Sequence, residues 1–226
     1  MADFKTIIIS DLHLGSPLAR SKDLKKFLKG LEFDRLIING DIFCDLNFSR
    51  LRKSDLHLLN LLRNLSKKKD VVWIEGNHDA GLIRLLSAFG IEVHEQYEFW
   101  WVGKCCVVVH GHQFDGAITE YPRISRFLSF LFVELQKVPG IKHWLPILMD
   151  KTAGKWQRLT PEVAKRALEF AKRKKYDLIF CGHTHERYAD ELDGIKYYNS
   201  GCWCGTINGY IEIAEGISLK HYRGEE

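Results

Sequence analysis

The sequence lacks any apolar run that approaches the ~20 residues of a membrane-spanning helix. Its first residues, MADFK, show neither the basic start nor the apolar core of a secretory signal, so we expect a cytoplasmic protein. The six cysteines also lack the spacing of zinc ribbons, because one residue separates Cys202 from Cys204 and Cys105 adjoins Cys106. We expect reduced, buried thiols that bind no metal.

A strong excess of charge of one sign is also missing. Lys and Arg number 33 and Asp and Glu number 29, which gives a formal net charge of +4. That balance does not indicate binding to nucleic acid, and we expect no nucleic-acid partner. The chain has 226 residues, of which 46% are hydrophobic. This length and composition predict a single domain over residues 1–226 with a sizeable core.

Short β-branched runs alternate with helical patterns along the chain, which predicts an α/β fold. Leucine spacing predicts helices over 21–28 and 50–65, with Ser21 as the N-cap of the first. Polar residues follow the strands, so we expect a ligand site beyond the carboxyl ends of the sheet. The predicted strands are 5–10, 35–39, 71–75, 104–109, 177–181, 196–199 and 207–213.

Residues 117–160 interrupt this alternation with an aromatic, basic segment of helical pattern. We predict a helical insertion, or lid, that lies over the site. Its apolar stripe is wider than packing on one neighbour requires, which suggests acyl chains or a bilayer surface as a second contact. Burial between two neighbours, or a dimer contact, explains the same pattern.

Histidines and carboxylates recur at five predicted strand ends. Side chains two residues apart in an extended segment point the same way, so a D-x-H or H-x-H pair directs two side chains to one place. Imidazole and carboxylate groups bind intermediate divalent metals. Two cations ~3.5–4 Å apart can activate a water and hold both oxygens of a displacement at phosphorus. The motifs are Asp11-x-His13, Gly40-Asp41, Gly76-Asn77-His78-Asp79, His110-Gly111-His112 and Gly182-His183-x-His185.

The series SDLHLG, NGDIF, EGNHD, VVHGH and CGHTH resembles the calcineurin-like metallophosphoesterase superfamily. The resemblance implies a four-layer α/β/β/α sandwich and two divalent cations bridged by Asp41. We expect manganese, with iron, zinc or nickel as alternatives. The resemblance also implies that His78, held by Asp79, stabilises the transition state or protonates the leaving oxygen. The implied ligands are Asp11, His13, Asp41 and His185 for one metal, and Asp41, Asn77, His110 and His183 for the other.

The motif HGHQFDG, the long insertion and the segment GIKYYNSGCW are similar to the UDP-2,3-diacylglucosamine pyrophosphohydrolase group. This resemblance implies cleavage of UDP-2,3-diacylglucosamine to UMP and a lipid sugar phosphate. The best-characterised members of that group carry Arg where this chain has His78. His112 either orients His110 or contacts phosphate, and Asn199 is either a phosphate donor or a turn residue. The candidate substrate contacts are Asn77, His112, Arg123, Arg126, Lys155 and Asn199.

Three functions follow from these patterns. The first is hydrolysis of a phosphodiester or pyrophosphate bond in a phosphorylated small molecule such as a nucleotide-linked lipid, with peripheral contact to the inner membrane through the insertion. The second is a phosphodiesterase that acts on another nucleotide or a cyclic nucleotide. The third is a metal-binding scaffold without turnover, against which the intact ligand set and the His78–Asp79 pair argue. The sequence predicts no particular oligomeric state.

Overall fold

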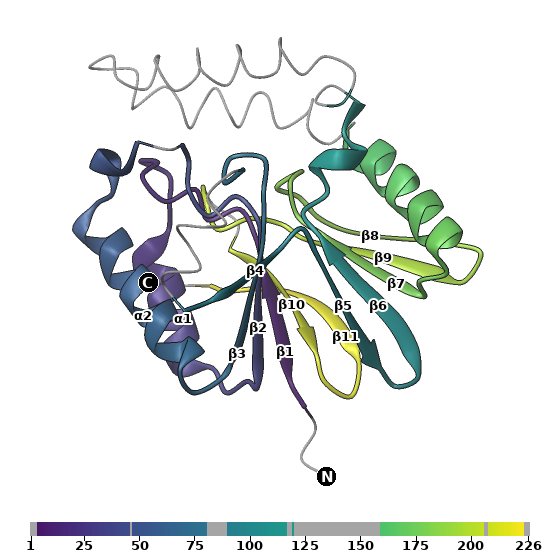
Figure 1. Ribbon diagram of the computed structural model, residues 1–226, viewed down its shortest axis with the longest axis horizontal. Helices are drawn as coiled ribbons and strands as arrows, with labels where there is room; N and C mark the ends of the chain where they lie inside the picture. Colours follow the sequence, from purple (N-terminus) through teal and green to yellow (C-terminus); the bar gives the residue numbers. More distant parts are fainter. Residues whose placement is uncertain are drawn as a thin grey trace.

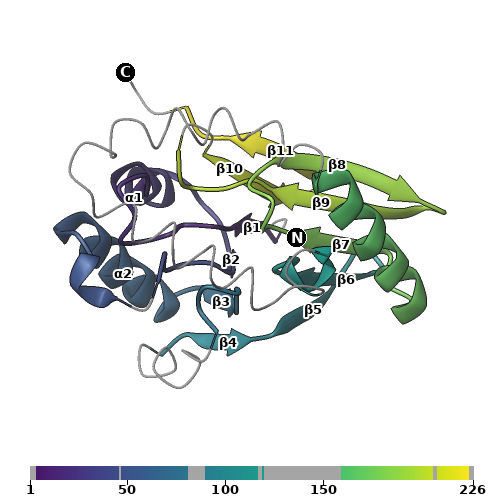
Figure 2. The same cartoon turned by 90° about the horizontal axis from the view of Figure 1, so that it is seen from above.

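The computed structural model describes residues 4–45, 47–80, 90–116, 119, 159–205 and 208–223. In these residues two β-sheets lie face to face, and helices cover their outer faces (Figure 1). Figure 2 shows the same layers from above. The predicted α/β/β/α sandwich is therefore confirmed. The insertion predicted at 117–160 lies outside the described residues, apart from Thr119, Leu159 and Thr160.

The first sheet has six strands in the order β11-β10-β1-β2-β3-β4. Strands β1, β2, β3 and the edge strand β4 run parallel, and β10 runs antiparallel to both β1 and β11. Ile8 of β1 pairs with Ile37 of β2, which pairs with Val72 of β3. The strands are β1 (Thr6–Ile9), β2 (Arg35–Asn39), β3 (Asp70–Ile74), β4 (Glu92–His94), β10 (Gly209–Ile213) and β11 (Ile217–His221).

The second sheet has five strands in the order β5-β6-β7-β9-β8. Its inner strands β6, β7 and β9 run parallel, and the edge strands β5 and β8 are antiparallel to their neighbours. The strands are β5 (Gln96–Trp101), β6 (Lys104–Val109), β7 (Leu178–Cys181), β8 (Arg187–Leu192) and β9 (Ile195–Ser200).

Helices α1 (Ser21–Gly30) and α2 (Lys53–Ser66) cover the first sheet, and a helix over 159–174 covers the second (Figure 1). The prediction that Ser21 caps α1 is wrong, because Arg20 is the N-cap and the Ser21 hydroxyl donates to the buried carboxylate of Asp55. Within the described residues, no helix combines the length and apolar character needed to span a bilayer. Two short 3₁₀ turns, η1 (Phe48–Arg50) and η2 (His112–Phe114), lie in loops between these elements.

Three apolar layers hold the sandwich together. Alternate residues of a strand face opposite sides of its sheet, so Ile7 and Ile9 pack toward α1 and α2 while Ile8 packs against the second sheet. Val107 and Val109 likewise face the helix over 159–174. Each such fully buried side chain contributes roughly 1.5–3 kcal/mol of transfer free energy. The parallel strands are thereby fixed with their carboxyl ends at one end of the sandwich.

Candidate metal centre

The polar residues of the centre follow parallel strands of both sheets. Asp11 lies two positions beyond the last residue of β1, and Asp41 lies two positions beyond the last residue of β2. His110 directly follows β6, and His183 comes soon after β7 in the other sheet. Hydrogen bonds join these loops, because the backbone N–H of His183 donates to Asp11 Oδ2 at 3.0 Å. The two sheets therefore contribute to one site.

Five of the seven expected metal ligands have a left-handed backbone, an uncommon conformation for residues other than glycine. Such residues cost of order 1–3 kcal/mol each and cluster at functional sites, where the surrounding structure holds them in place. Here the backbone N–H of Asp11 donates to Gly40 O and that of His13 donates to Asp41 O. The strained residues are Asp11 (φ 54°), His13 (φ 44°), Asp41 (φ 51°), His183 (φ 68°) and His185 (φ 58°).

Two buried carboxylates, Asp11 and Asp41, lie among the imidazoles. Asp41 Oδ2 is 3.3 Å from Nε2 of His110 and 4.0 Å from Nε2 of His13. Asp11 Oδ1 is 3.2 Å from Nε2 of His185 and 3.9 Å from Nε2 of His110. Each carboxylate therefore lies near histidines that follow different strands. This is the arrangement expected if a carboxylate and these histidines bind the same cation.

Ligand atoms within 4.8 Å of one another form three groups that can each hold a cation. Two of the groups contain Asp41, which is the geometry expected of a bridging carboxylate. The third joins His13 and His185 to Cys204. The two groups that contain Asp41 are His13, Asp41 and His78, and Asp41, His110 and His183.

Three buried polar atoms at the centre have no hydrogen-bond partner in the described part of the chain: Asp11 Oδ1, His110 Nε2 and Asn77 Oδ1. An unsatisfied buried polar atom is costly, and native structures contain few of them. Coordination to a divalent cation satisfies such atoms, and N and O donors suit manganese, iron and zinc. The donor set therefore fits the two cations implied by the sequence.

Hydrogen bonds to the outer nitrogens orient two of these imidazoles. His110 Nδ1 lies 2.8 Å from the carbonyl oxygen of Asn39, so it carries the proton and leaves Nε2 as a lone-pair donor. His183 Nε2 lies 2.9 Å from Asp115 Oδ2, which leaves Nδ1 for a cation. A second nitrogen bonded to a carboxylate or carbonyl is the usual arrangement of metal-binding histidines.

Electrostatics at the centre separate the histidines into two kinds. Burial opposes protonation of His110 and His185, but nearby carboxylates outweigh it. Asp41 and Asp11 raise the pKa of His110 to about 10, and Asp11 raises that of His185 to about 9. Burial and the neighbouring His185 lower the pKa of His13 to about 3. Positive charge is therefore favoured beside the two carboxylates, where the cations are expected.

The expected partner of His78 differs in the structure. Asp79 accepts the backbone N–H groups of Ile42 and Phe43, both at 2.9 Å, so it supports the loop that follows Asp41. The ring of His78 instead places Nδ1 2.7 Å from the carbonyl oxygen of Cys44. We therefore correct the expectation that Asp79 holds His78: a backbone carbonyl does so. His78 Nε2 lies 3.9 Å from Asp41 Oδ2, at the edge of the centre.

Two glycines allow the loops to approach one another. A Cβ atom at Gly40 would overlap the imidazole of His110, and a Cβ atom at Gly76 would overlap the backbone nitrogen and Oδ1 of Asp41. The Gly-Asp and Gly-Asn pairs of the motifs thus have a steric reason.

The candidate substrate contacts have different outcomes. Asn199 is wrong as a substrate contact, because it is fully buried and its amide is used internally. Its Nδ2 donates to Gly182 O at 2.5 Å and its Oδ1 accepts from the Gly201 N–H at 3.0 Å. His112 is partly buried beside His110, with ring centroids 5.6 Å apart. Arg123, Arg126 and Lys155 lie outside the described residues.

Sequence reasoning gave no function to two neighbours of the ligands. Asp115 contacts His183, and Cys204 Sγ lies 3.8 Å from Nδ1 of His185. Asp115 belongs to the motif HGHQFDG, where a carboxylate shortly after a histidine pair was a usable signal. For Cys204 the sequence gave no such signal, because its spacing from the other cysteines does not match that of known zinc sites.

The comparisons with known proteins agree with this geometry. The sequence matches the profile of the calcineurin-like phosphoesterases over residues 4–187. A phosphodiesterase of Methanocaldococcus jannaschii, MJ0936, is 42% identical over 60 residues, which cover 25% of this chain and 35% of that protein. The DNA polymerase II small subunit of Thermoplasma acidophilum is 23% identical over 230 residues. That match covers 86% of this chain and 44% of the relative, so the chain spans less than half of that relative's length.

Solved structures of low sequence identity share the fold. A structure described as a novel archaeal phosphodiesterase has a TM-score of 0.53 at 16% identity and covers 97% of this chain and 100% of that one. Vps29 of Chaetomium thermophilum has a TM-score of 0.55 at 12% identity, and the match covers 99% of this chain and 91% of that one. The fold and the His/Asp centre together define a metallophosphoesterase. The chain belongs to the calcineurin-like phosphoesterase family, which confirms the superfamily predicted from the motifs.

Proposed function

We propose that the protein hydrolyses phosphodiester or pyrophosphate bonds at a centre of two divalent cations, with manganese as the metal. The observation that carries the proposal is the convergence of His and Asp side chains from both sheets on Asp11 and Asp41. When bound, the two cations would activate a water and withdraw charge from the phosphate. The proposed ligands are Asp11, His13, Asp41, Asn77, His110, His183 and His185.

His78 is the residue proposed to donate a proton or a hydrogen bond during the reaction. Its Nδ1 faces a carbonyl oxygen, which only accepts, so Nδ1 stays protonated in either charge state. The other ring nitrogen, Nε2, lies 3.9 Å from Asp41 Oδ2 and so faces the centre. In the cationic form Nε2 donates to a phosphoryl oxygen or to the leaving oxygen, a contribution worth roughly 10²–10⁴-fold in rate.

A phosphodiester is one of the two candidate bonds because a relative with local similarity is named a phosphodiesterase. A pyrophosphate bond is the other. As the natural substrate to test first we propose UDP-2,3-diacylglucosamine, which would bring the protein to the inner membrane. Its support comes from the motif series alone, since the insertion proposed to bind it lies outside the described residues. Arg123, Arg126 and Lys155 are the residues proposed to contact its diphosphate.

The test compares two substrates and three variants. Protein loaded with Mn²⁺ is assayed on bis-p-nitrophenyl phosphate and on UDP-2,3-diacylglucosamine, beside Asn77→Ala, His78→Ala and the exposed control Lys104→Ala. We expect turnover of the model diester by the wild type and by Lys104→Ala, with losses above about 100-fold in the other two. Turnover of neither substrate by the wild type contradicts the proposal and favours a scaffold. Turnover of the diester alone rejects the lipid substrate and keeps the reaction.

A further inference from the structure

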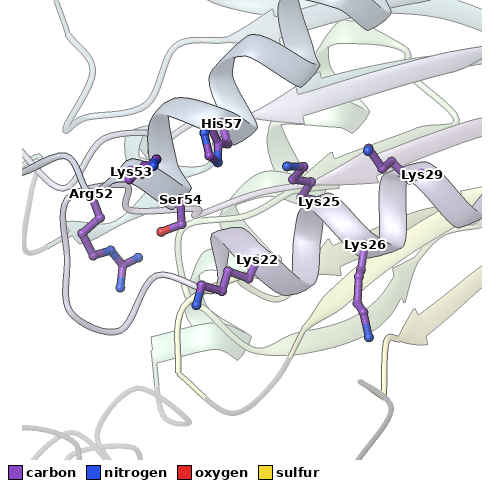
Figure 3. A pocket seen from close by; sticks show the side chains of 8 residues that line it. All are labelled: Lys22, Lys25, Lys26, Lys29, Arg52, Lys53, Ser54 and His57. Carbon is purple, nitrogen blue, oxygen red and sulfur yellow. The ribbon is translucent and has the colours of Figure 1, made fainter.

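A basic groove runs between α1 and α2, on the outer layer of the first sheet. It is open and has a volume of about 810 Å³. Figure 3 shows that Lys25 and Lys29 project on the side of α1 that faces α2, and that Lys22 lies near Arg52. Among the described residues, no acidic and no apolar side chain lines the groove. The lining residues are Lys22, Lys25, Lys26, Lys29, Arg52, Lys53, Ser54 and His57.

The positions of these cations are costly for the helices themselves. Lys22, Lys25 and Lys29 are three and four residues apart on α1, and like charges at that spacing destabilise a helix. Lys22 and Lys53 also lie in the first turns of α1 and α2, where the helix dipole disfavours positive charge. In the described part of the chain no salt bridge involves Lys22, Lys25, Lys29 or Lys53. Ordinary surface charge patterning would place acids between them.

The acidic residues nearest to the groove serve other groups. Asp23 is paired with Arg20 at 2.7 Å. Asp55 is fully buried and accepts from Ser21 and from Arg52, whose guanidinium is thereby partly neutralised. Among the described residues, Lys22, Lys25, Lys29 and Lys53 therefore carry most of the positive charge that faces the groove without a salt bridge.

We propose that this groove binds one strand of the phosphate backbone of a nucleic-acid duplex, independently of base sequence. Lys22 and Lys29 are seven positions apart on α1, which is about 10 Å of helix axis. One strand of a duplex carries a phosphate every ~3.4 Å of its axis, so about three phosphates span the same length as Lys22, Lys25 and Lys29. Such binding goes beyond the hydrolytic function and differs from the expectation, based on net charge, that nucleic acid is not a partner.

The lining argues against other anionic partners. Single-stranded nucleic acid is usually held by aromatic side chains that stack on its bases, and no Phe, Tyr or Trp is among the described residues that line the groove. A folded protein partner is usually anchored by Trp, Tyr or other large side chains, and the described lining offers none of these. A bilayer presents a flat surface, whereas the cations here line a concavity. A duplex, whose bases face inward, needs only the charges that are present.

The test measures binding without hydrolysis. Fluorescence anisotropy of a labelled duplex of about 20 base pairs is followed in EDTA at several salt concentrations, so failure of the metal centre does not affect the result. The groove variant is Lys25→Glu/Lys29→Glu. The matched control is Arg173→Glu/Lys174→Glu, which changes net charge equally on exposed residues near the end of the helix over 159–174. The variant Lys25→Arg/Lys29→Arg keeps the charge, and Lys25→Gln/Lys29→Gln replaces the Glu pair if that pair does not fold.

We expect the wild type to show a slope of log affinity against log salt of about −3 to −4. The groove variant should bind at least tenfold more weakly at about 0.1 M salt, with a slope reduced by about two. The control and the Arg variant should stay within twofold of the wild type. Equal losses in groove variant and control, binding to single strands only, or binding to anionic vesicles or inorganic polyphosphate but not to the duplex would each overturn the proposal.

Discussion

Nε2 of His13 lies 3.1 Å from Nε2 of His185, although the two residues are 172 positions apart in the chain. Asp11 Oδ1 is 3.9 Å from the first of these nitrogens and 3.2 Å from the second. Two imidazole nitrogens at this distance share at most one proton, because two protonated rings would repel each other in a buried site. A divalent cation between the two nitrogens and the carboxylate satisfies all three groups.

We predict that His78 contributes to the rate without holding metal. His78→Gln should lower kcat on bis-p-nitrophenyl phosphate by about 10²–10³-fold, because Nε2, the proposed proton donor, is removed. The variant should keep the metal content of the wild type, as measured by elemental analysis after gel filtration. A ring nitrogen of His78 also lies within 4.8 Å of the ligand atoms of His13 and Asp41. If the variant lost a metal ion, His78 would be a metal ligand, which would contradict this prediction.

Asp115 is predicted to act through His183. Asp115→Asn should weaken binding of the more weakly held Mn²⁺ by about 10–100-fold, since the partner that fixes the imidazole tautomer is altered. Titration of metal-free protein with Mn²⁺, followed by calorimetry, measures the change. The control Asp193→Asn removes an exposed carboxylate that pairs with exposed Lys172 and should leave the affinity unchanged. Unchanged affinity in Asp115→Asn would contradict the role given to this residue.

Gly76 is predicted to be intolerant of any side chain. The Cβ atom of Gly76→Ala would overlap the backbone and carboxylate of Asp41, which must then shift. We expect overpacking to cost about 1–3 kcal/mol and the metal content to fall. Gly216→Ala is the matched control, because a Cβ atom there meets nothing within 4 Å. Thermal unfolding and elemental analysis check both variants, and an active, fully loaded Gly76→Ala would be inconsistent with the described geometry.

Asp55 is predicted to stabilise the fold in a pH-dependent way. Burial raises the pKa of Asp55, but hydrogen bonds from Arg52 and Ser21 lower it by more than burial raises it. The folded-state pKa therefore lies below the ordinary value of 3.8. A group with a lowered pKa stabilises the folded state above its unfolded pKa, and the contribution disappears as the pH falls through the folded pKa. Asp55→Ala should therefore lower the free energy of unfolding by about 3 kcal/mol at pH 7.

Urea denaturation at neutral pH and below about pH 4 measures this effect. The difference between Asp55→Ala and the wild type should shrink in acid, where the wild-type carboxylate is increasingly protonated. Asp23→Ala, which breaks a partly exposed pair with Arg20, should cost less than about 1 kcal/mol. A difference for Asp55→Ala that is independent of pH would show that its carboxylate charge contributes nothing.

The buried parallel strands could be predicted from the sequence, and several exposed elements could not. β2 and β6 have the bounds predicted, because their β-branched residues are buried on both faces. The edge strands β5 and β8 were missed, since the exposed and part-buried residues of β8 include charges on both faces. β4 has only three residues, too few for a periodic signal.

The ligand motifs could be predicted from the sequence because each places a metal-binding residue type at a strand end. Most of the contacts that support the ligands could not be predicted. The group beside His78 is the backbone carbonyl of Cys44, which any residue type at that position would offer, so the sequence does not indicate this contact. The basic groove was missed for a similar reason, since two modest charge clusters, 22–29 and 52–57, become one only when α1 and α2 pack together.

Anomalous X-ray diffraction from crystals grown with Mn²⁺ tests the central claim most directly. We predict two anomalous peaks ~3.5–4 Å apart, with a carboxylate oxygen of Asp41 within bonding distance of both. Asp11, His13 and His185 should surround one peak, and Asn77, His110 and His183 the other. The absence of any peak within reach of Asp41, or a single peak held without it, would contradict the account.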